Sequence, residues 1–359
     1  MLDGLTHEQQ MLQESTRRFV DDEMLPHEDI VDREGHVPIE LGRQIESRAK
    51  EVGLFSANLP ENVGGGGLDY TSMAVIEREF GRTSHALHAW VARPTELLLA
   101  TEGGQKEHYL DPCVTGAKRE LFALSEPEAG SDIMSMKSHA KRDGDDWILN
   151  GSKHFISGPL MPDFAIVFAI TGHDETPRGP RPRITAFLVD VGMPGFDIQV
   201  GYNCVSYRGY LNFKLDFDNV RLSPDHILGE EGRGLELSGK WLGMGRIWVG
   251  ATCCGKAERL FEMATSWAAE RKQFGQAIGK FQATGFKLAD MAVELRAADL
   301  LVKDAISKAD QGVMTDSDAA MVKLYCSEML NRVADNTVQI YGGMGLMDDL
   351  PVQRLWRDS

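Results

Sequence analysis

Apolar residues recur at helical spacing in the first third of the chain. Leu41, Ile45, Ala49 and Val52 follow one another every three or four residues, which predicts a helix over 38–52. Thr6 and Gln9 have the spacing of a capping box, so a first helix should begin there and end before Pro26. Similar patterns predict helices from Thr71 and over 95–110. Residues 1–120 therefore form a predicted N-terminal α-helical domain.

The pattern changes to strands near Leu121. Leu211, Phe213, Leu215 and Phe217 alternate with polar residues, as in a strand with one buried face. Continuous apolar runs at 164–170 and 184–191 predict buried strands, with a loop over 171–182 between them. The run 147–149 precedes Asn-Gly at 150–151, a dipeptide typical of a tight turn. Residues 121–234 are therefore expected to form a middle antiparallel β domain.

Long amphipathic helices are predicted for the rest of the chain. Their apolar faces are formed by residues 257, 260, 261, 264 and 267, by residues 288, 291, 295, 298 and 302, and by residues 322, 326, 329 and 333. Short links between such helices favour an up-and-down C-terminal helical bundle over 235–359. The fold class is α+β multidomain, and helices before and after a block of strands argue against a Rossmann-type alternation.

Composition excludes some classes of function. The net charge of −16 is the wrong sign for a protein that binds nucleic-acid backbones. The five cysteines have no zinc-type spacing, so no metal site is expected. The cysteines are expected to be reduced thiols. The N-terminus has no signal-peptide pattern, and no apolar run approaches the ~20 residues that span a bilayer. These features predict a cytoplasmic protein.

Residues 122–132, FALSEPEAGSD, are the first candidate for a ligand site. Small residues let a ligand approach the backbone closely, and Ser125 and Ser131 can both donate and accept hydrogen bonds. A strand that ends in such a loop can hold a flat polar cofactor or a phosphate. The same residues are also typical of a plain turn after a strand.

Four further segments accompany this stretch in a fixed order. They are PENVGGGGLDY at 60–70, NGSKHFIS at 150–157, RKQFGQAIGKFQ at 271–282 and QIYGGMG at 339–345. Together the segments resemble the acyl-CoA dehydrogenase family of flavoproteins, over essentially the whole chain. The resemblance implies FAD as cofactor and an acyl-CoA as substrate.

The resemblance implies two strands that contact the flavin. Phe122, Leu124 and Ser125 would lie along the isoalloxazine ring, with Gly130 and Ser131 at the pyrophosphate and the CoA arm. Phe155, Ile156 and Ser157 match the second strand, where the Ser157 hydroxyl would bond near the reactive ring nitrogen. Many relatives carry Trp in place of Phe155, so an aromatic wall is kept while an indole donor is lost.

A second group of residues would reach the FAD of a neighbouring subunit. By the resemblance it comprises Arg271, Gln273, Phe274, Ile278, Phe281 and Gln282, with Gln339, Gly342 and Gly343 under the adenosine half. Action across subunits requires an oligomer, and the family suggests a homotetramer built as a dimer of dimers. Without the resemblance, these strings would be interpreted as a Gly-capped helix end and an interhelical turn.

The resemblance also implies the reaction. Arg246 matches an arginine that holds substrate, while Gly243 stands where relatives often have Asp. A glutamate base is expected in a segment beyond Ser359, because Gly245 stands at the alternative position used by some subfamilies. Glu126 and Glu128 are not assigned as bases, and Glu126 belongs to the flavin segment. The catalytic base thus stays unknown within 1–359.

The expected activity is α,β-desaturation of an acyl-CoA thioester, with hydride transfer to FAD and electrons passed to an electron-transfer flavoprotein, as in fatty-acid β-oxidation. Two alternatives remain at this point. One is an acyl-CoA oxidase or flavin monooxygenase on the same scaffold, and the other is a non-catalytic acyl-CoA- or flavin-binding protein.

Overall fold

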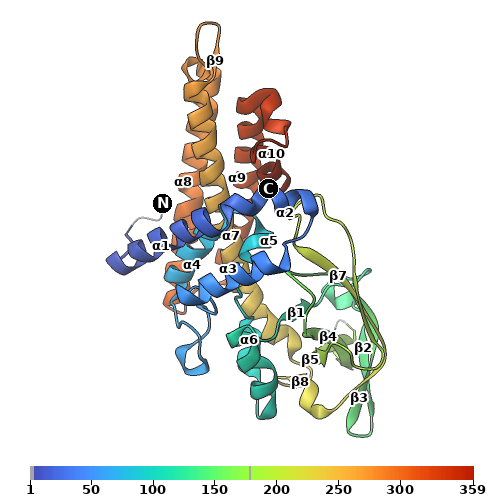
Figure 1. Ribbon diagram of the computed structural model, residues 1–359. Helices are drawn as coiled ribbons and strands as arrows, with labels where there is room; N and C mark the ends of the chain where they lie inside the picture. Colours follow the sequence, from blue (N-terminus) through green and yellow to red (C-terminus); the bar gives the residue numbers. More distant parts are fainter. Residues whose placement is uncertain (1–3, 178) are drawn as a thin grey trace.

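The N-terminal part of the protein is helical, as predicted. The computed structural model describes residues 4–177 and 179–359. The α-helices of this part are α1 (His7–Glu23), α2 (Glu28–Glu34), α3 (Ile39–Glu51), α4 (Tyr70–Phe80), α5 (His85–His88) and α6 (Asp111–Thr115) (Figure 1). The predicted capping box begins α1, because the Thr6 hydroxyl accepts from the Gln9 amide at 3.2 Å and the Gln9 side chain accepts from the Thr6 amide.

The single helix predicted over 95–110 is wrong. The chain forms two short segments there instead, the 3₁₀-helix η3 (Glu96–Ala100) and the π-helical turn η4 (Lys106–Leu110). Gly103 and Gly104 separate them, and Gly103 has φ 51°, a left-handed conformation that a continuous α-helix does not allow. The apolar spacing therefore predicted helical structure correctly on each side of Gly103 and Gly104, but one helix does not continue through these glycines.

One sheet forms the middle domain, in the order β6-β7-β3-β2-β4-β5-β8, with β1 paired to β4. Its strands are β1 (Glu120–Ala123), β2 (His139–Asp143), β3 (Asp146–Gly158), β4 (Phe164–Asp174), β5 (Arg181–Asp190), β6 (Phe196–Val200), β7 (Leu211–Leu222) and β8 (Ile227–Leu228). Most pairs are antiparallel, but β1 and β2 both pair with β4 in parallel. The expectation of an antiparallel sheet thus holds for most of its ladders and not for these two.

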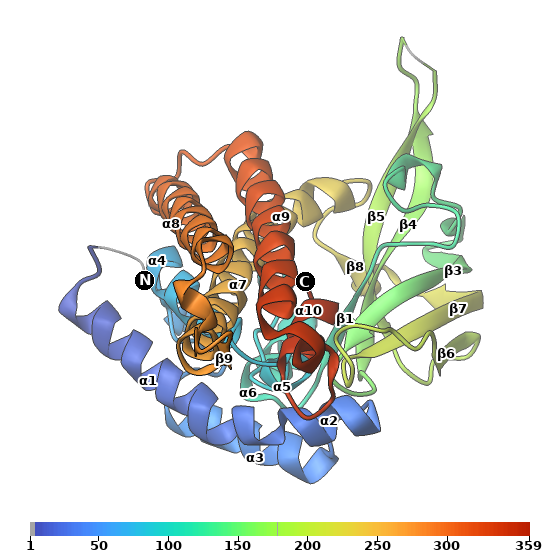
Figure 2. The same ribbon diagram turned by 90° about the horizontal axis from the view of Figure 1, so that it is seen from above.

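The Asn-Gly at 150–151 is not the predicted turn. Strand β3 runs straight through it, with a register irregularity between Leu149 and Gly151. The turn lies earlier, between β2 and β3, where Gly144 has φ 65°. Likewise, half of the predicted loop over 171–182 is strand, because β4 continues to Asp174 and β5 begins at Arg181 in a projecting hairpin (Figure 2).

The C-terminal part is the predicted bundle. Its main helices are α7 (Gly234–Glu270), α8 (Gln282–Asp310) and α9 (Asp316–Tyr341), followed by η8 (Gly342–Leu346) and α10 (Val352–Arg357). A small hairpin of β9 (Lys272–Gln273) and β10 (Gln276–Ala277), followed by η7 (Ile278–Lys280), joins α7 to α8 at one end of the bundle (Figure 1). The predicted apolar faces are buried, including Leu260, Met291, Val302, Cys326 and Val333.

A buried charge network fastens the N-terminal helices to the bundle. Arg78 on α4 donates to Asp299 on α8 at 3.0 Å and to Glu258 on α7 at 3.0 Å. Seen from above, α7 passes between the N-terminal helices and the other bundle helices (Figure 2). We propose domain divisions at 120/121 and 234/235, as expected from the sequence. No helix in the described part of the chain is long and apolar enough to cross a membrane.

Candidate active site

The residues predicted to contact the flavin from the second strand lie on a β-bulge. Lys153 pairs with Leu215 and Ile156 pairs with Phe213, so His154 and Phe155 both oppose Lys214. Phe155 has φ 56°, a left-handed conformation that is strained for an aromatic residue, and its side chain is 57% exposed. The bulge thus leaves Phe155 exposed at the surface, outside the set of residues that line the cavity described below.

A buried lysine and glutamate hold the first candidate segment against this strand. Lys153 Nζ donates to Glu126 Oε1 at 2.7 Å and to the Leu124 carbonyl at 3.0 Å. The Glu126 carboxylate also accepts from the amides of Lys137 at 2.6 Å and Ser138 at 3.1 Å. Burial lowers the pKa of Lys153 to about 8, although Glu126 opposes that shift. The loop is therefore tied to β3 by these side chains together with one backbone hydrogen bond, from the His154 amide to the Ser125 carbonyl at 3.1 Å.

Ser157 belongs to a second polar group, at the end of β3. Its hydroxyl accepts a hydrogen bond from Asn212 Nδ2 at 3.2 Å, and its carbonyl accepts from the Tyr210 hydroxyl at 3.3 Å. Asn212 Oδ1 is buried without a hydrogen-bond partner in the described part of the chain. A buried unpaired acceptor is costly, so a ligand with an N–H or O–H donor would satisfy it.

A cavity of about 230 Å³ begins at these strands and extends into the N-terminal domain. Phe122 and Ser157 line it from the sheet, Trp241 from α7, and Glu77 and Arg93 from the N-terminal domain. The rings of Phe122 and Trp241 lie 4.5 Å apart between centroids. Phe122 and Ser157, which come from the two segments predicted to contact the flavin, therefore share one cavity. Arg246, predicted to hold substrate, is exposed on α7 and outside the cavity lining.

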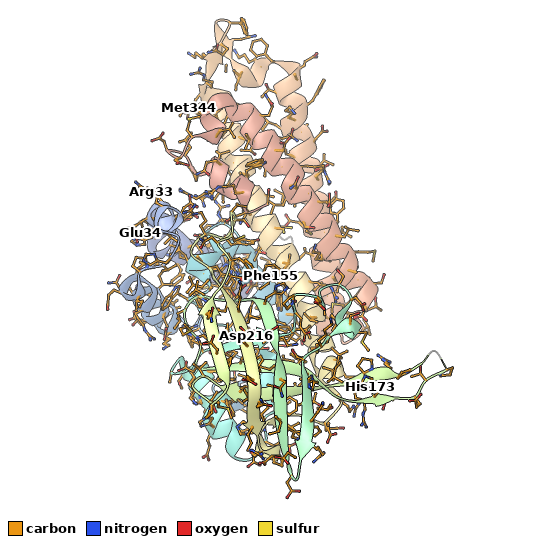
Figure 3. All side chains as sticks on the ribbon, turned by 90° about the vertical axis from the view of Figure 1, so that its right-hand side faces the viewer. Arg33, Glu34, Phe155, His173, Asp216 and Met344 are labelled. Atoms are coloured by element: carbon orange, nitrogen blue, oxygen red, sulfur yellow. The ribbon has the colours of Figure 1, made fainter. Side chains whose placement is uncertain are left out.

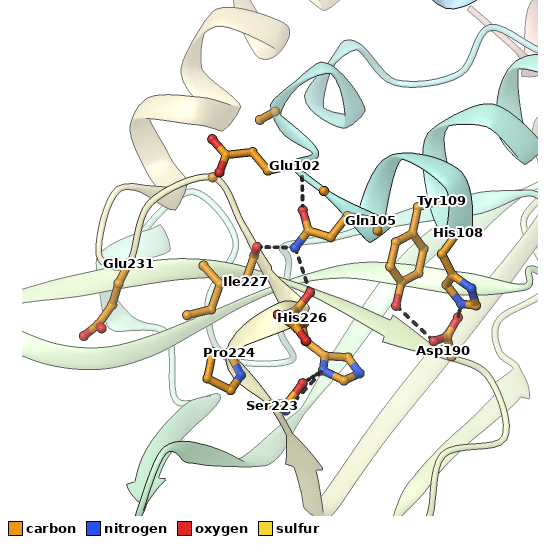
Figure 4. A pocket seen from close by; sticks show the side chains of 15 residues that line it. Glu102, Gln105, His108, Tyr109, Asp190, Ser223, Pro224, His226, Ile227 and Glu231 are labelled. Carbon is orange, nitrogen blue, oxygen red and sulfur yellow. Dashed lines mark hydrogen bonds and ion pairs between the residues drawn. The ribbon is translucent and has the colours of Figure 1, made fainter.

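A larger hollow lies elsewhere. It measures about 800 Å³, is open, and runs between η4 and β8, with Glu102, Asp190, Asp225 and Glu231 among its lining residues (Figure 4). Its polar groups bond mainly to one another, as Tyr109 does to Asp190 at 2.9 Å. None of the predicted site residues lines it. We therefore place the candidate active site at the smaller cavity.

The second predicted group lies at the other end of the molecule. The β9–β10 hairpin and η8 both lie at the bundle end away from the sheet (Figure 1), and Met344 in η8 is well apart from Phe155 (Figure 3). In this group Arg271, Gln273, Phe274, Gln282, Gln339, Gly342 and Gly343 are exposed, while Ile278 and Phe281 are half-buried. One subunit does not bring the two groups together, as expected if the second group serves a neighbouring subunit.

Sequence reasoning missed several residues of the site. Lys153, Tyr210 and Asn212 sit in or beside predicted strands, and Glu77 and Arg93 are distant from every motif. Lys153 offered the one available signal. A lysine at an inward position of a strand indicates a buried acidic partner, because lysine is almost never fully buried unless it is paired. The other residues enter the site through tertiary packing alone.

The comparisons with known proteins agree with this geometry. Three family descriptions match successive parts of the chain: "Acyl-CoA dehydrogenase, N-terminal domain" at residues 6–117, the "middle domain" at 121–220 and the "C-terminal domain" at 232–359. The three matches follow the helical, β and helical parts of the structure. The chain belongs to the acyl-CoA dehydrogenase family and is an FAD-dependent oxidoreductase.

Similarity to individual proteins extends along the chain. The 3-(aryl)acrylate reductase of Clostridium sporogenes is 35% identical, over 98% of this chain and 93% of that protein. The CarC subunit of the caffeyl-CoA reductase-Etf complex of Acetobacterium woodii is 34% identical over the same shares. The structure of butyryl-CoA dehydrogenase from Megasphaera elsdenii is 33% identical, has a TM-score of 0.88, and covers 100% of this chain and 94% of that chain.

The residues present fit the cofactor. A Cβ at Gly130 would meet no atom within 4 Å, so the backbone after the first flavin segment is open to a ligand. Phe155 offers an exposed aromatic face, and Asn212 Oδ1 offers an unpaired acceptor beside Ser157. A flat ring system with N–H donors and carbonyl acceptors matches these features.

Proposed function

We propose that this protein desaturates an acyl-CoA thioester between its α and β carbons and passes the electrons to an electron-transfer flavoprotein. One observation carries the proposal: Phe122 and Ser157, both at predicted flavin-contact positions, line the same 230 Å³ cavity. A group that enters this cavity lies against the flavin-facing strands, where proximity favours transfer. The bound FAD supplies the hydride acceptor.

The chain's own residues orient the reactants. Ser157 presents a hydroxyl held by Asn212, and Tyr210 fixes the backbone at Ser157. Phe122 and Trp241 provide apolar walls that exclude water from the acyl group. In this proposal Ser131 and Arg246, both exposed, contact the CoA arm and the substrate outside the cavity.

The α proton has to be taken by a carboxylate, and two nearby candidates are already engaged. Glu126 holds Lys153 and two backbone amides, and exposed Glu128 pairs with Lys137. Gly245 leaves the alternative position on α7 without a side chain. The resemblance places the base in a segment following Ser359, and we keep that hypothesis.

We propose that the protein acts as a homotetramer. Phe286, Val293 and Leu300 are exposed on α8 at intervals of seven residues, so they form one apolar stripe along the helix. Phe274 at the hairpin tip is 93% exposed. A partner subunit at the stripe would cover it and could bring the second group of residues to the FAD. Val293→Glu should dissociate the assembly and release FAD, whereas Val313→Glu, outside the stripe, should do neither. Sedimentation measures the dissociation, and flavin absorbance measures the release of FAD.

A second exposed patch supports an electron-transfer partner. Tyr202 and Val205 are exposed on the segment between β6 and β7, and the Tyr202 ring lies 5.1 Å from that of Phe155. Aromatic groups at a surface beside a redox centre suit docking of another flavoprotein. Relatives named for an Etf complex motivate the same assignment. Val205→Asp should slow reduction of the electron-transfer flavoprotein while leaving flavin reduction by acyl-CoA unchanged.

An anaerobic titration with acyl-CoA tests the function. Loss of flavin absorbance on mixing, followed by reduction of an electron-transfer flavoprotein, is the expected result. Fast reoxidation by air would favour the oxidase or monooxygenase instead, and binding without bleaching would favour a non-catalytic protein. The same titration with an enoyl-CoA and reduced flavin measures the reverse direction, for which relatives are named reductases.

A further inference from the structure

The lining that the N-terminal domain contributes to the acyl cavity is charged, which is unusual for a site that receives an alkyl chain. Arg93 donates a hydrogen bond to Glu77, whose side chain is almost completely buried, and both residues line the cavity. Glu77 lies on α4 and Arg93 on the loop after α5, so helix packing brings the pair together. The Glu77 side chain is 4% exposed and that of Arg93 is 35% exposed, so a methyl group placed here would displace the water that still solvates the pair and would offer no hydrogen bonds in return.

Two histidines extend this polar surface. The His85 ring lies edge-on to Tyr210 at 4.5 Å and to His88 at 4.4 Å between centroids, and all three line the cavity. Burial, together with Lys256 and Arg93, lowers the pKa of His85 to about 3, and burial lowers that of His88 well below its ordinary value. Both rings are therefore neutral at physiological pH. His88 Nδ1 is enclosed by protein atoms, and the Phe80 backbone is the polar group beside the ring.

The charge balance decides which end group fits. Glu77 already neutralises Arg93, and Glu46 neutralises Arg119 through a 2.8 Å bond, while Glu120 adds another carboxylate to the lining. A substrate carboxylate would enter beside these acids with its nearest guanidinium already paired. A hydroxyl both donates and accepts, so it can pair with the N–H groups of Arg93 and with the carboxylate of Glu77 alike.

We propose that this enzyme selects short acyl-CoA thioesters whose far end carries a neutral hydrogen-bonding group, above all a hydroxyl, and that Arg93 and Glu77 determine this specificity. The inference rests on the proposed desaturation and names its substrate class. A cavity of about 230 Å³ is smaller than the ~300–1,000 Å³ usual for ligand pockets, which restricts the acyl group to a short one.

The test compares three five-carbon thioesters on the full-length holoenzyme: pentanoyl-CoA, 5-hydroxypentanoyl-CoA and glutaryl-CoA, with four- and six-carbon homologues of each. Flavin bleaching should be most efficient with the hydroxyacyl series, by roughly 10- to 100-fold in kcat/KM, because hydrogen bonds to charged groups contribute about 1.5–3 kcal/mol. Equal or better use of the alkyl or the carboxylate series would overturn the inference. Bleaching by none of the thioesters would instead contradict the proposed function.

A paired variant separates specificity from folding. Replacing both partners, Glu77→Gln with Arg93→Met, leaves no unpaired buried charge and should shift the preference toward pentanoyl-CoA. Arg93→Lys should keep the hydroxyacyl preference. Arg33→Met, which removes an exposed arginine paired with Asp29, is the matched control and should leave the preference unchanged. A double variant that binds FAD and retains the wild-type preference would show that the pair does not select the substrate.

Discussion

Lys153 Nζ lies 2.7 Å from Glu126 Oε1, and both side chains are buried between the two segments predicted to contact the flavin. Glu126 also caps two backbone amides at Lys137 and Ser138. Burial opposes the ionisation of Glu126, but Lys153 and these hydrogen bonds together hold its pKa below the ordinary value. The pair connects the loop at 124–138 to the bulged strand, so it positions the flavin site without acting in the chemistry.

Removal of Lys153 should therefore affect both stability and cofactor retention. Lys153→Met leaves the Glu126 charge buried without its cation, which we expect to cost about 3–5 kcal/mol in the free energy of unfolding. The loosened loop should also release FAD, measured as the flavin-to-protein absorbance ratio after gel filtration. Lys137→Met removes an exposed lysine from the same loop and should do neither. Full FAD retention in the Lys153 variant would contradict the positioning role.

Glu258 should make stability fall in acid. Burial opposes its ionisation, but Arg78 and Arg17 outweigh burial and lower its pKa from 4.5 to about 2. A depressed carboxyl pKa stabilises the fold above the unfolded-state value, and this stabilisation of about 3 kcal/mol is lost as pH falls from 4.5 towards 2. Urea unfolding at several pH values should show a flatter profile for Glu258→Gln across this window. Exposed Glu128→Gln should follow the wild-type profile, and a parallel profile for Glu258→Gln would refute the assignment.

Phe155 should tolerate glycine better than alanine. Its φ of 56° is a conformation that a Cβ disfavours by about 1–2 kcal/mol and that glycine adopts freely. Phe155→Gly should thus unfold at a higher urea concentration than Phe155→Ala. At Lys214, opposite the bulge on β7, the order should reverse, because glycine weakens a regular strand. The same order at both positions would mean that the bulge strain is absent in solution.

Two glycines of α7 should respond oppositely to alanine. A Cβ at Gly245 would meet no atom within 4 Å, so Gly245→Ala should stabilise the helix by about 0.5–1 kcal/mol. A Cβ at Gly255 would lie 1.7 Å from the carbonyl oxygen of Arg78, so Gly255→Ala should force α4 and α7 apart. Thermal unfolding of the two variants gives the comparison, and a stabilised Gly255→Ala would disprove the close helix contact.

The sequence by itself determined the architecture and the cofactor class. Helical spacing and the capping box at Thr6 predicted α1 closely, since these signals are local. Alternation predicted the buried face of β7 for the same reason. The motif order indicated the acyl-CoA dehydrogenase family, which the comparisons confirm.

Tertiary structure alone decided how the site is held and what the cavity lining offers a substrate. The bulge at Phe155 depends on pairing with β7, and the Lys153–Glu126 contact joins residues 27 positions apart. Arg93 meets Glu77 because α4 and the loop after α5 pack together, which no periodicity encodes. Burial and charge pairing are properties of the packed chain. The sequence motifs therefore indicated residues that contact the flavin, but they did not indicate Glu77 and Arg93 in the cavity lining.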